Sequence, residues 1–146
     1  MLSTLSLLLP LFGPGPAWAD EPVLTNDNPV IHALRARDPA PCAALPADPD
    51  LAATLHAIAV TDIAPAWVPL RAAGCLTELF PADPRFIGWV TPWFTDEDFG
   101  GLGLAVLTTS LANPETRTVL EPFARAAPER WRALYTRRLD AADATP

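Results

Sequence analysis

The chain has 146 residues and a net charge of −7, with a pI near 4.6, and all ten of its basic residues are arginine. An acidic chain is a poor partner for nucleic acid or for an anionic membrane, because both attract basic surfaces. The length is sufficient for one domain with a hydrophobic core of its own.

The first 19 residues have the features of a secretory signal peptide. Residues 2–12 are mostly apolar, Gly-Pro-Gly-Pro follows, and Ala17-Trp18-Ala19 precedes Asp20. This is the order of an apolar core, a helix break and a processing site. The apolar run is too short to span a bilayer as a helix, although it lacks the preceding Lys or Arg that is usual in signal peptides. We expect residues 1–19 to be removed and residues 20–146 to form a mature domain that is periplasmic or secreted, with no membrane span. The alternative is an apolar N-terminal helix that is retained.

Two cysteines, Cys42 and Cys75, fit an oxidising compartment. We expect them to form a disulfide, which would stabilise the fold by roughly 3–4 kcal/mol on the chain-entropy model. The alternative is a pair of buried free thiols. A Cys-x-x-Cys motif is absent, and the only histidines are His32 and His56. Neither a metal nor any other cofactor is therefore expected.

A pattern repeats along the chain, and each copy begins with an Asp-Pro or Asn-Pro pair. The pairs are Asp48-Pro49, Asp83-Pro84 and Asn113-Pro114, and their prolines are 35 and 30 residues apart. This spacing is close to the period of helical-hairpin arrays. Asp and Asn are good N-caps, and proline fits the first position of a helix. We expect each pair to begin a helix.

Apolar residues recur at helical spacing along the chain, and no stretch shows the alternation of a half-buried strand. In the second copy of the repeat Phe86, Val90, Trp93 and Phe94 form a single apolar stripe. The sequence therefore predicts an all-α fold, with helices over residues 29–37, 49–59, 65–80, 84–94, 97–112, 114–124 and 128–140.

Residues 48–140 resemble HEAT-like repeat proteins. The resemblance rests on Val90-Thr91-Pro92-Trp93-Phe94 and Leu120-Glu121-Pro122-Phe123-Ala124, where a proline lies in an apolar helix, and on the small residues of Leu70–Leu76. The family's Asp and Arg ladder is not kept, since Gly103 stands where the second helices align Arg71. The resemblance implies a short right-handed α-solenoid of about three stacked helical hairpins. It also implies a non-catalytic scaffold that binds a protein partner.

Residues that could carry catalysis are few. The mature chain has one serine, Ser110, which would need His32 or His56 from another helix, and no nucleophile elbow is present. Residues 100–103 (Gly-Gly-Leu-Gly) lack the Lys-Ser/Thr end of a phosphate loop, so we expect them to let a neighbouring helix approach closely. Residues 96–98 (Asp-Glu-Asp) lack the further acids of an EF-hand and suit the start of a helix. We expect no catalytic and no metal-binding residues.

Four aromatic residues are the candidates for partner binding, because aromatic side chains on a helical surface often anchor a partner. They are Trp67, Trp89, Trp93 and Phe99. Trp93 lies on the core stripe, and Trp89 lies beside it, where we expect partial exposure and, with the helix of the third repeat, a binding surface. The alternative is that all four are packing residues.

A second hypothesis is a small exported enzyme or ligand carrier with a pocket near His56, Trp67 and Trp93. A deep pocket that holds His56 with a perturbed carboxylate would favour this hypothesis. A shallow aromatic groove would favour protein binding.

Overall fold

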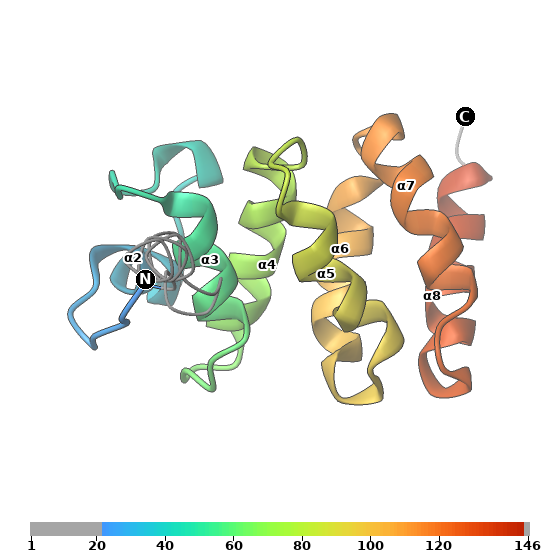
Figure 1. Cartoon of the computed structure of the whole chain (residues 1–146), viewed down its shortest axis with the longest axis horizontal. Coiled ribbons are helices and arrows are strands. Elements are labelled where there is room, and N and C mark those ends of the chain that lie inside the picture. The colour runs from blue at the N-terminus through green and yellow to red at the C-terminus, as the bar shows by residue number, and fades with distance from the viewer. Residues whose placement is uncertain (1–21, 145–146) are drawn as a thin grey trace, which may run out of the picture.

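The computed structural model describes residues 22–144, and every regular element in this part is a helix (Figure 1). The α-helices are α2 (Pro29–Arg35), α3 (Leu51–Ala59), α4 (Trp67–Leu79), α5 (Phe86–Thr95), α6 (Gly100–Ser110), α7 (Pro114–Arg125) and α8 (Glu129–Asp143). Two short 3-10 helices, η2 (Cys42–Ala44) and η3 (Glu97–Phe99), complete the set. The all-α prediction is confirmed, and each predicted helix is present. The predicted signal peptide lies outside the described residues. No described helix is long and apolar enough to cross a membrane.

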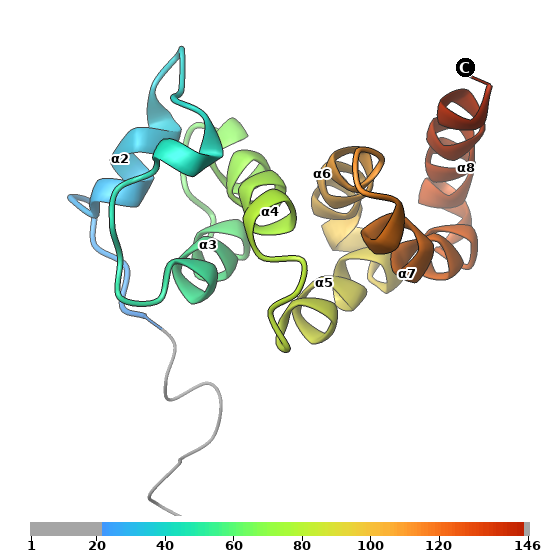
Figure 2. The same cartoon turned by 90° about the horizontal axis from the view of Figure 1, so that it is seen from above.

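The helices follow one another in chain order along the long axis of the molecule (Figure 1). Figure 2 shows them in two rows, with α3, α5 and α7 on one side and α4, α6 and α8 on the other. Contacts join α3 with α4, α5 with α6, and α7 with α8. Contacts also run within the rows, joining α5 with α7, and α4 with α6 and then α8. The molecule therefore has one face formed by α3, α5 and α7 and another formed by α4, α6 and α8.

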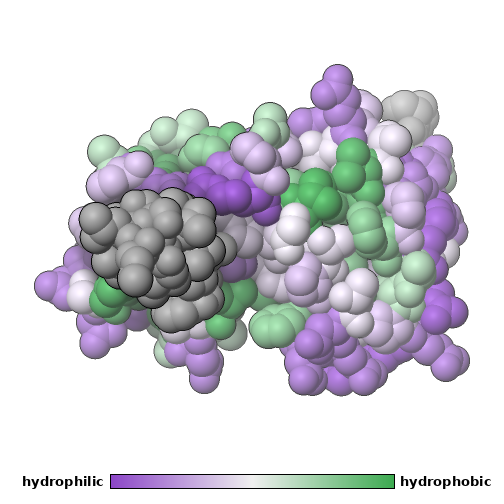
Figure 3. Space-filling view, in the orientation of Figure 1, coloured by the Kyte–Doolittle hydropathy of each residue, from purple (hydrophilic) through white to green (hydrophobic). Residues whose placement is uncertain are grey.

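The hydrophobic core lies between the rows and continues from α2 to α8. The stripe predicted in α5 faces this core, and its members Phe86, Val90, Trp93 and Phe94 are all buried. Burial of each such side chain contributes roughly 1.5–3 kcal/mol. The face of α5 and α7 is largely hydrophilic or intermediate, with a small apolar patch where the two helices meet (Figure 3). The apolar periodicity of the sequence thus located the core correctly.

The third of the repeated pairs, Asn113-Pro114, starts its helix as predicted. The Asn113 side chain accepts hydrogen bonds from the backbone N–H groups of Glu115 and Thr116, at 3.1 and 3.3 Å, and Pro114 occupies the first turn of α7. The same arrangement, not expected from the repeat, begins α2, where Asn28 caps the helix ahead of Pro29.

The N-cap predictions for Asp48 and Asp83 are wrong. The cap of α3 is Asp50, and α5 begins after Arg85. Asp48 accepts a hydrogen bond from the N–H of Asp50, and Asp83 accepts one from the N–H of Arg85, each at 2.9 Å. An aspartate side chain can close a turn with the backbone two residues on, as well as cap a helix. In these two pairs the Asp-Pro turn precedes the helix.

Two glycines let α8 pack closely on α6. A Cβ at Gly103 would lie 2.4 Å from the Tyr135 hydroxyl oxygen and 2.7 Å from the Trp93 carbonyl oxygen. A Cβ at Gly100 would lie 1.9 Å from the Trp131 ring. The buried Tyr135 hydroxyl donates a hydrogen bond to the Gly100 carbonyl at 2.8 Å. The expected role of these small residues is confirmed, and Tyr135 occupies the space that an arginine at position 103 would need.

Candidate functional site: a groove across α4 and α6

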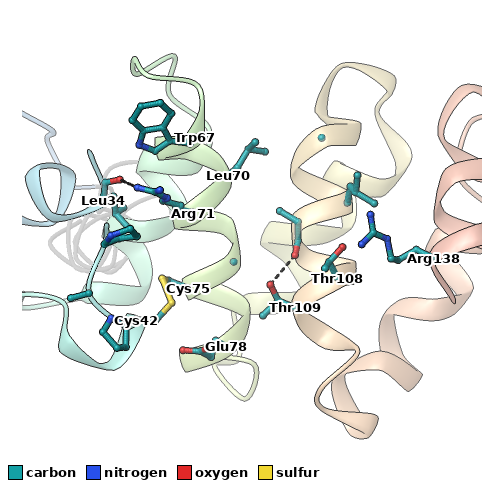
Figure 4. Close-up of a pocket in the computed structure, with 17 residues that line it drawn as sticks. Leu34, Cys42, Trp67, Leu70, Arg71, Cys75, Glu78, Thr108, Thr109 and Arg138 are labelled. Atoms are coloured by element: carbon teal, nitrogen blue, oxygen red, sulfur yellow. Dashed lines mark hydrogen bonds between the residues drawn. A yellow bond between two sulfur atoms is a disulfide. The ribbon is translucent and has the colours of Figure 1, made fainter. Parts of the chain in front are cut away.

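A groove with a volume of about 660 Å³ runs across α4 and α6 on the face formed by α4, α6 and α8 (Figure 4). We call it the α4–α6 groove. Its volume is within the range of sites that bind small molecules or peptide segments. It is lined by Leu34, Pro39, Ala40, Pro41, Cys42, Trp67, Leu70, Arg71, Gly74, Cys75, Glu78, Gly101, Leu104, Ala105, Thr108, Thr109 and Arg138.

One continuous face of α4 forms a side of the groove. Trp67, Arg71, Gly74, Cys75 and Glu78 all line it, and their spacing of three or four residues places them on the same side of a helix. The other side of α4 is buried, with Val68, Ala72 and Leu76 at 0 % exposure. Packing of this apolar side into the core therefore turns the first face outward.

The segment between α2 and η2 forms the N-terminal wall of the groove, and two contacts hold it against α4. Arg71 Nη1 donates to the carbonyl oxygens of Leu34 and Ala36, at 2.9 and 2.5 Å, and Nη2 donates to that of Arg37 at 3.3 Å. One turn further along α4, Cys75 forms the expected disulfide with Cys42. Both contacts come from successive turns of α4, so the wall and the helix are joined at two points.

Small and apolar residues of α6 form the far side of the groove, and α8 adds an arginine. Gly101 and Ala105 contribute little side-chain volume on this side, and Leu104 adds apolar surface. Figure 4 shows Arg138 reaching from α8 toward α6, beside Thr108. The Thr109 hydroxyl donates to the Ala105 carbonyl at 2.9 Å.

The ionisable groups that line the groove carry a net positive charge, although the chain as a whole is acidic. They are Arg71, Arg138 and Glu78, whereas the chain has a net charge of −7. Within the described residues, neither arginine forms an ion pair with a carboxylate. By contrast, Arg85, Arg117 and Arg125 each form at least one. The groove is therefore locally suited to an anionic group.

The four aromatic candidates lie in different environments. Trp67 is 39 % exposed and lines the groove. Trp93 is 2 % exposed and belongs to the core, Trp89 is half-buried, and Phe99, in η3, is 36 % exposed but does not line the groove. The structure thus brings only Trp67 of the four to the groove.

His56 lies away from the groove, in an aromatic stack between α3 and α5. Its ring centroid is 4.7 Å from that of Trp89 and 5.8 Å from that of Trp93, with nearly parallel planes. The Arg85 guanidinium lies over the Trp89 ring at 4.6 Å. The groove that Trp67 lines includes neither His56 nor Trp93, so the structure does not gather these three residues around this cavity.

Sequence reasoning missed Leu70, Arg71 and Arg138 as site residues. Leu70 and Arg71 follow Trp67 by three and four residues, so helical spacing from Trp67 could have identified them. Arg138 enters the groove only because α8 packs on α6, and no local pattern carries that information.

Ser110, the one serine considered as a nucleophile, has a structural role. Ser110 is 1 % exposed and donates to the Leu107 carbonyl at 2.7 Å. Among residues 22–144, no three His, Cys, Asp or Glu side chains lie close enough to hold a metal ion. Hydrogen bonds from Arg85 hold the pKa values of Asp50 and Asp83 below their usual range, which keeps both carboxylates ionised at neutral pH. Such carboxylates are not poised as general acids.

The chain matches no protein-family model, no curated protein and no solved structure. The groove and the residues that line it are therefore the features that bear on its function.

Proposed function

We propose that this chain is an exported, non-catalytic module of HEAT-like helical repeats that binds another protein in the α4–α6 groove. The observation that carries the proposal is the exposed apolar edge of the groove. Trp67 and Leu70 lie one turn apart on α4, at 39 % and 41 % exposure. Large apolar side chains gathered at a groove are typical of surfaces that bind a partner.

The arrangement of the helices supports the repeat assignment. The pairs α3–α4, α5–α6 and α7–α8 contact one another internally, and contacts within the rows join successive pairs. Pro92 and Pro122 lie inside α5 and α7, the first helices of their pairs. In a short α-solenoid of this kind, α4, α6 and α8 would form the inner surface. Repeat arrays commonly bind partners on such extended inner surfaces.

The disulfide supports export, since such bonds persist mainly in oxidising compartments. Intact mass of the protein, with and without reduction before thiol alkylation, tests this part of the proposal. We expect a chain that begins at Asp20 and takes up no alkylating reagent until it is reduced. A full-length chain with two free thiols would overturn the assignment to a periplasmic or secreted location.

Protein binding is better supported than the alternative of an enzyme or ligand carrier. That alternative requires a pocket that holds His56, but the His56 ring stacks with Trp89 and Trp93 instead. The groove also carries no acid–base pair, because Glu78 is its only carboxylate.

Site-specific photo-crosslinking in exporting cells tests partner binding. A photoreactive amino acid at Leu70 would report on the groove, and one at Val119, which is 46 % exposed on α7, would report on the other row of helices. We expect a discrete protein adduct from position 70 and none from position 119. Identical adducts from both positions, or none from either, would contradict binding in the groove.

A further inference from the structure

We infer that the α4–α6 groove recognises a short segment of its partner in which an aspartate or glutamate lies near an aromatic or aliphatic side chain. This inference rests on the proposed function and adds the chemistry of the partner. In this arrangement, the carboxylate binds at Arg138, and the apolar side chain packs against Trp67 and Leu70.

The charge of Arg138 is the first argument. Arg138 lines the groove, and its side chain makes neither a hydrogen bond nor an ion pair with any other described residue. The chain has 17 acidic residues against ten basic ones, yet none of the described carboxylates is placed on this guanidinium. An arginine stays charged at any ordinary pH, and its planar fork binds a carboxylate through two parallel hydrogen bonds. A carboxylate is the group that complements it best.

The surroundings of Arg138 are the second argument. Thr108 lies beside it on α6 (Figure 4), is exposed, and makes no side-chain hydrogen bond within the described residues. The next residue, Thr109, donates instead to the backbone of its own helix. The Thr108 hydroxyl is thus available as a second donor to a carboxylate bound by Arg138.

The positive charge of Arg71 reinforces this preference. Its hydrogen bonds go to three backbone carbonyls, which do not neutralise the guanidinium. Glu78 lies near the C-terminal end of α4, away from Trp67 at the first turn. The groove therefore offers an apolar edge at Trp67, a donor pair at Arg138 and Thr108, and a single repulsive acid at Glu78.

The length of the groove sets the size of the segment. The face of α4 from Trp67 to Glu78 spans eleven residue-to-residue steps, or about 16 Å at 1.5 Å per residue. An extended chain of about five residues covers this distance. A heptapeptide is therefore a suitable probe.

Selection of random heptapeptides on phage by the purified, disulfide-bonded protein tests the inference. We expect the wild type to enrich peptides that combine Asp or Glu with an aromatic or aliphatic residue. Arg138→Glu should replace the acidic preference by Lys or Arg and keep the apolar one. Ala105→Phe, which fills the far side of the groove, should abolish enrichment, whereas Val119→Ser should select as the wild type does. Leu70→Asp removes the apolar edge at an exposed position, and it replaces Ala105→Phe if that variant does not fold.

A synthetic peptide of the enriched sequence gives the magnitude. Arg138→Ala should weaken its binding by about three- to tenfold, because the ion pair is partly solvated. Added salt should weaken binding to the wild type more than binding to Arg138→Ala.

The outcomes separate the two proposals. If the wild type enriches no peptide, or the groove-filled variant selects the same peptides as the wild type, binding in the groove fails and the inference fails with it. If enrichment depends on the groove but shows no acidic preference, and Arg138→Glu leaves the selection unchanged, protein binding stands and the carboxylate inference is overturned.

Discussion

Arg85 binds both carboxylate oxygens of Asp50, with Nη1 2.8 Å from Oδ2 and Nη2 3.0 Å from Oδ1. Each of the two residues directly follows an Asp-Pro pair in the sequence. Arg85 also binds Asp83 at 2.8 Å and lies over the Trp89 ring. This one side chain thus connects the N-terminal ends of α3 and α5.

Asp50→Asn should lower the free energy of unfolding by about 0.5–1 kcal/mol at neutral pH. Asparagine can still cap α3 but loses the charge that Arg85 binds, and the pair is only partly shielded from water, with side chains 46 % and 48 % exposed. The pKa of Asp50 is lower in the folded protein than its ordinary 3.8. The stabilisation is therefore present above that value and is lost as the pH falls through the lowered pKa.

Urea unfolding of the wild type and Asp50→Asn checks this prediction at neutral pH and below the ordinary carboxylate pKa. The difference in free energy between the two proteins should shrink at the acidic pH. A difference that stays constant would show that the charge pairing of Asp50 with Arg85 does not account for it.

Gly103→Ala should destabilise the protein by about 1–3 kcal/mol, because overpacked cores lose stability of this order. The new Cβ would meet the Tyr135 hydroxyl and the Trp93 carbonyl oxygen. Gly88→Ala is the matched control, since a Cβ at this helical position meets nothing within 4 Å. It should stabilise the protein by up to about 1 kcal/mol. Thermal and urea unfolding measure both changes, and effects of the same sign would contradict the packing described for α6 and α8.

Much of the helical layout could be predicted because each helix carries its own apolar stripe. Phe86, Val90, Trp93 and Phe94 appear at helical spacing in the sequence and are buried together in α5. The disulfide could be predicted as well, since the chain has only two cysteines. The information for the stripe lies within one helix, and two cysteines allow only one intramolecular pairing.

The groove could not be predicted in the same way, because it depends on contacts between helices. The apolar stripe of α5 assigned Trp93 to the core, where it is 2 % exposed, but no such pattern placed Trp67, which is 39 % exposed, at the groove. Arg138 becomes a groove residue only when α8 packs on α6 through Gly100 and Gly103. The starts of α3 and α5 were also misplaced, since an Asp-Pro pair suits a turn as well as a helix N-terminus.

Tyr135 should make the fold sensitive to alkali. Burial raises its pKa from 10.0 to about 12, since the phenolate is poorly solvated among the core residues. Because the folded pKa is the higher one, the protonated form is favoured in the folded state. The contribution of protonated Tyr135 to the stability of the fold is complete below pH 10 and is lost as the pH rises through about 12. The total loss should be about 2–3 kcal/mol.

Tyrosinate absorbance measures this titration directly, because the chain contains a single tyrosine. The folded protein should titrate near pH 12, and the urea-unfolded chain near pH 10. Tyr135→Phe should remove the alkaline loss of stability as measured by urea unfolding. Titration of the folded protein at the unfolded pKa would contradict the burial of the hydroxyl.

The two contacts that hold the wall of the groove on α4 should contribute unequally. Replacing Cys42 and Cys75 together by serine should cost about 3–4 kcal/mol, because the disulfide closes a loop of 33 residues. Arg71→Ala should cost less, since its three carbonyl acceptors are exposed or partly exposed and can bind water instead.

Amide hydrogen exchange shows whether these two contacts hold the wall. The cysteine replacement and Arg71→Ala should each raise exchange in residues 36–42 relative to α8, and a protein that carries both changes should show the largest increase. Arg137→Ala is the matched control, because this exposed side chain on α8 makes no hydrogen bond or ion pair within the described residues. If either change lowered the unfolding temperature without faster exchange in residues 36–42, the contact it removes would stabilise the fold as a whole without holding the wall of the groove.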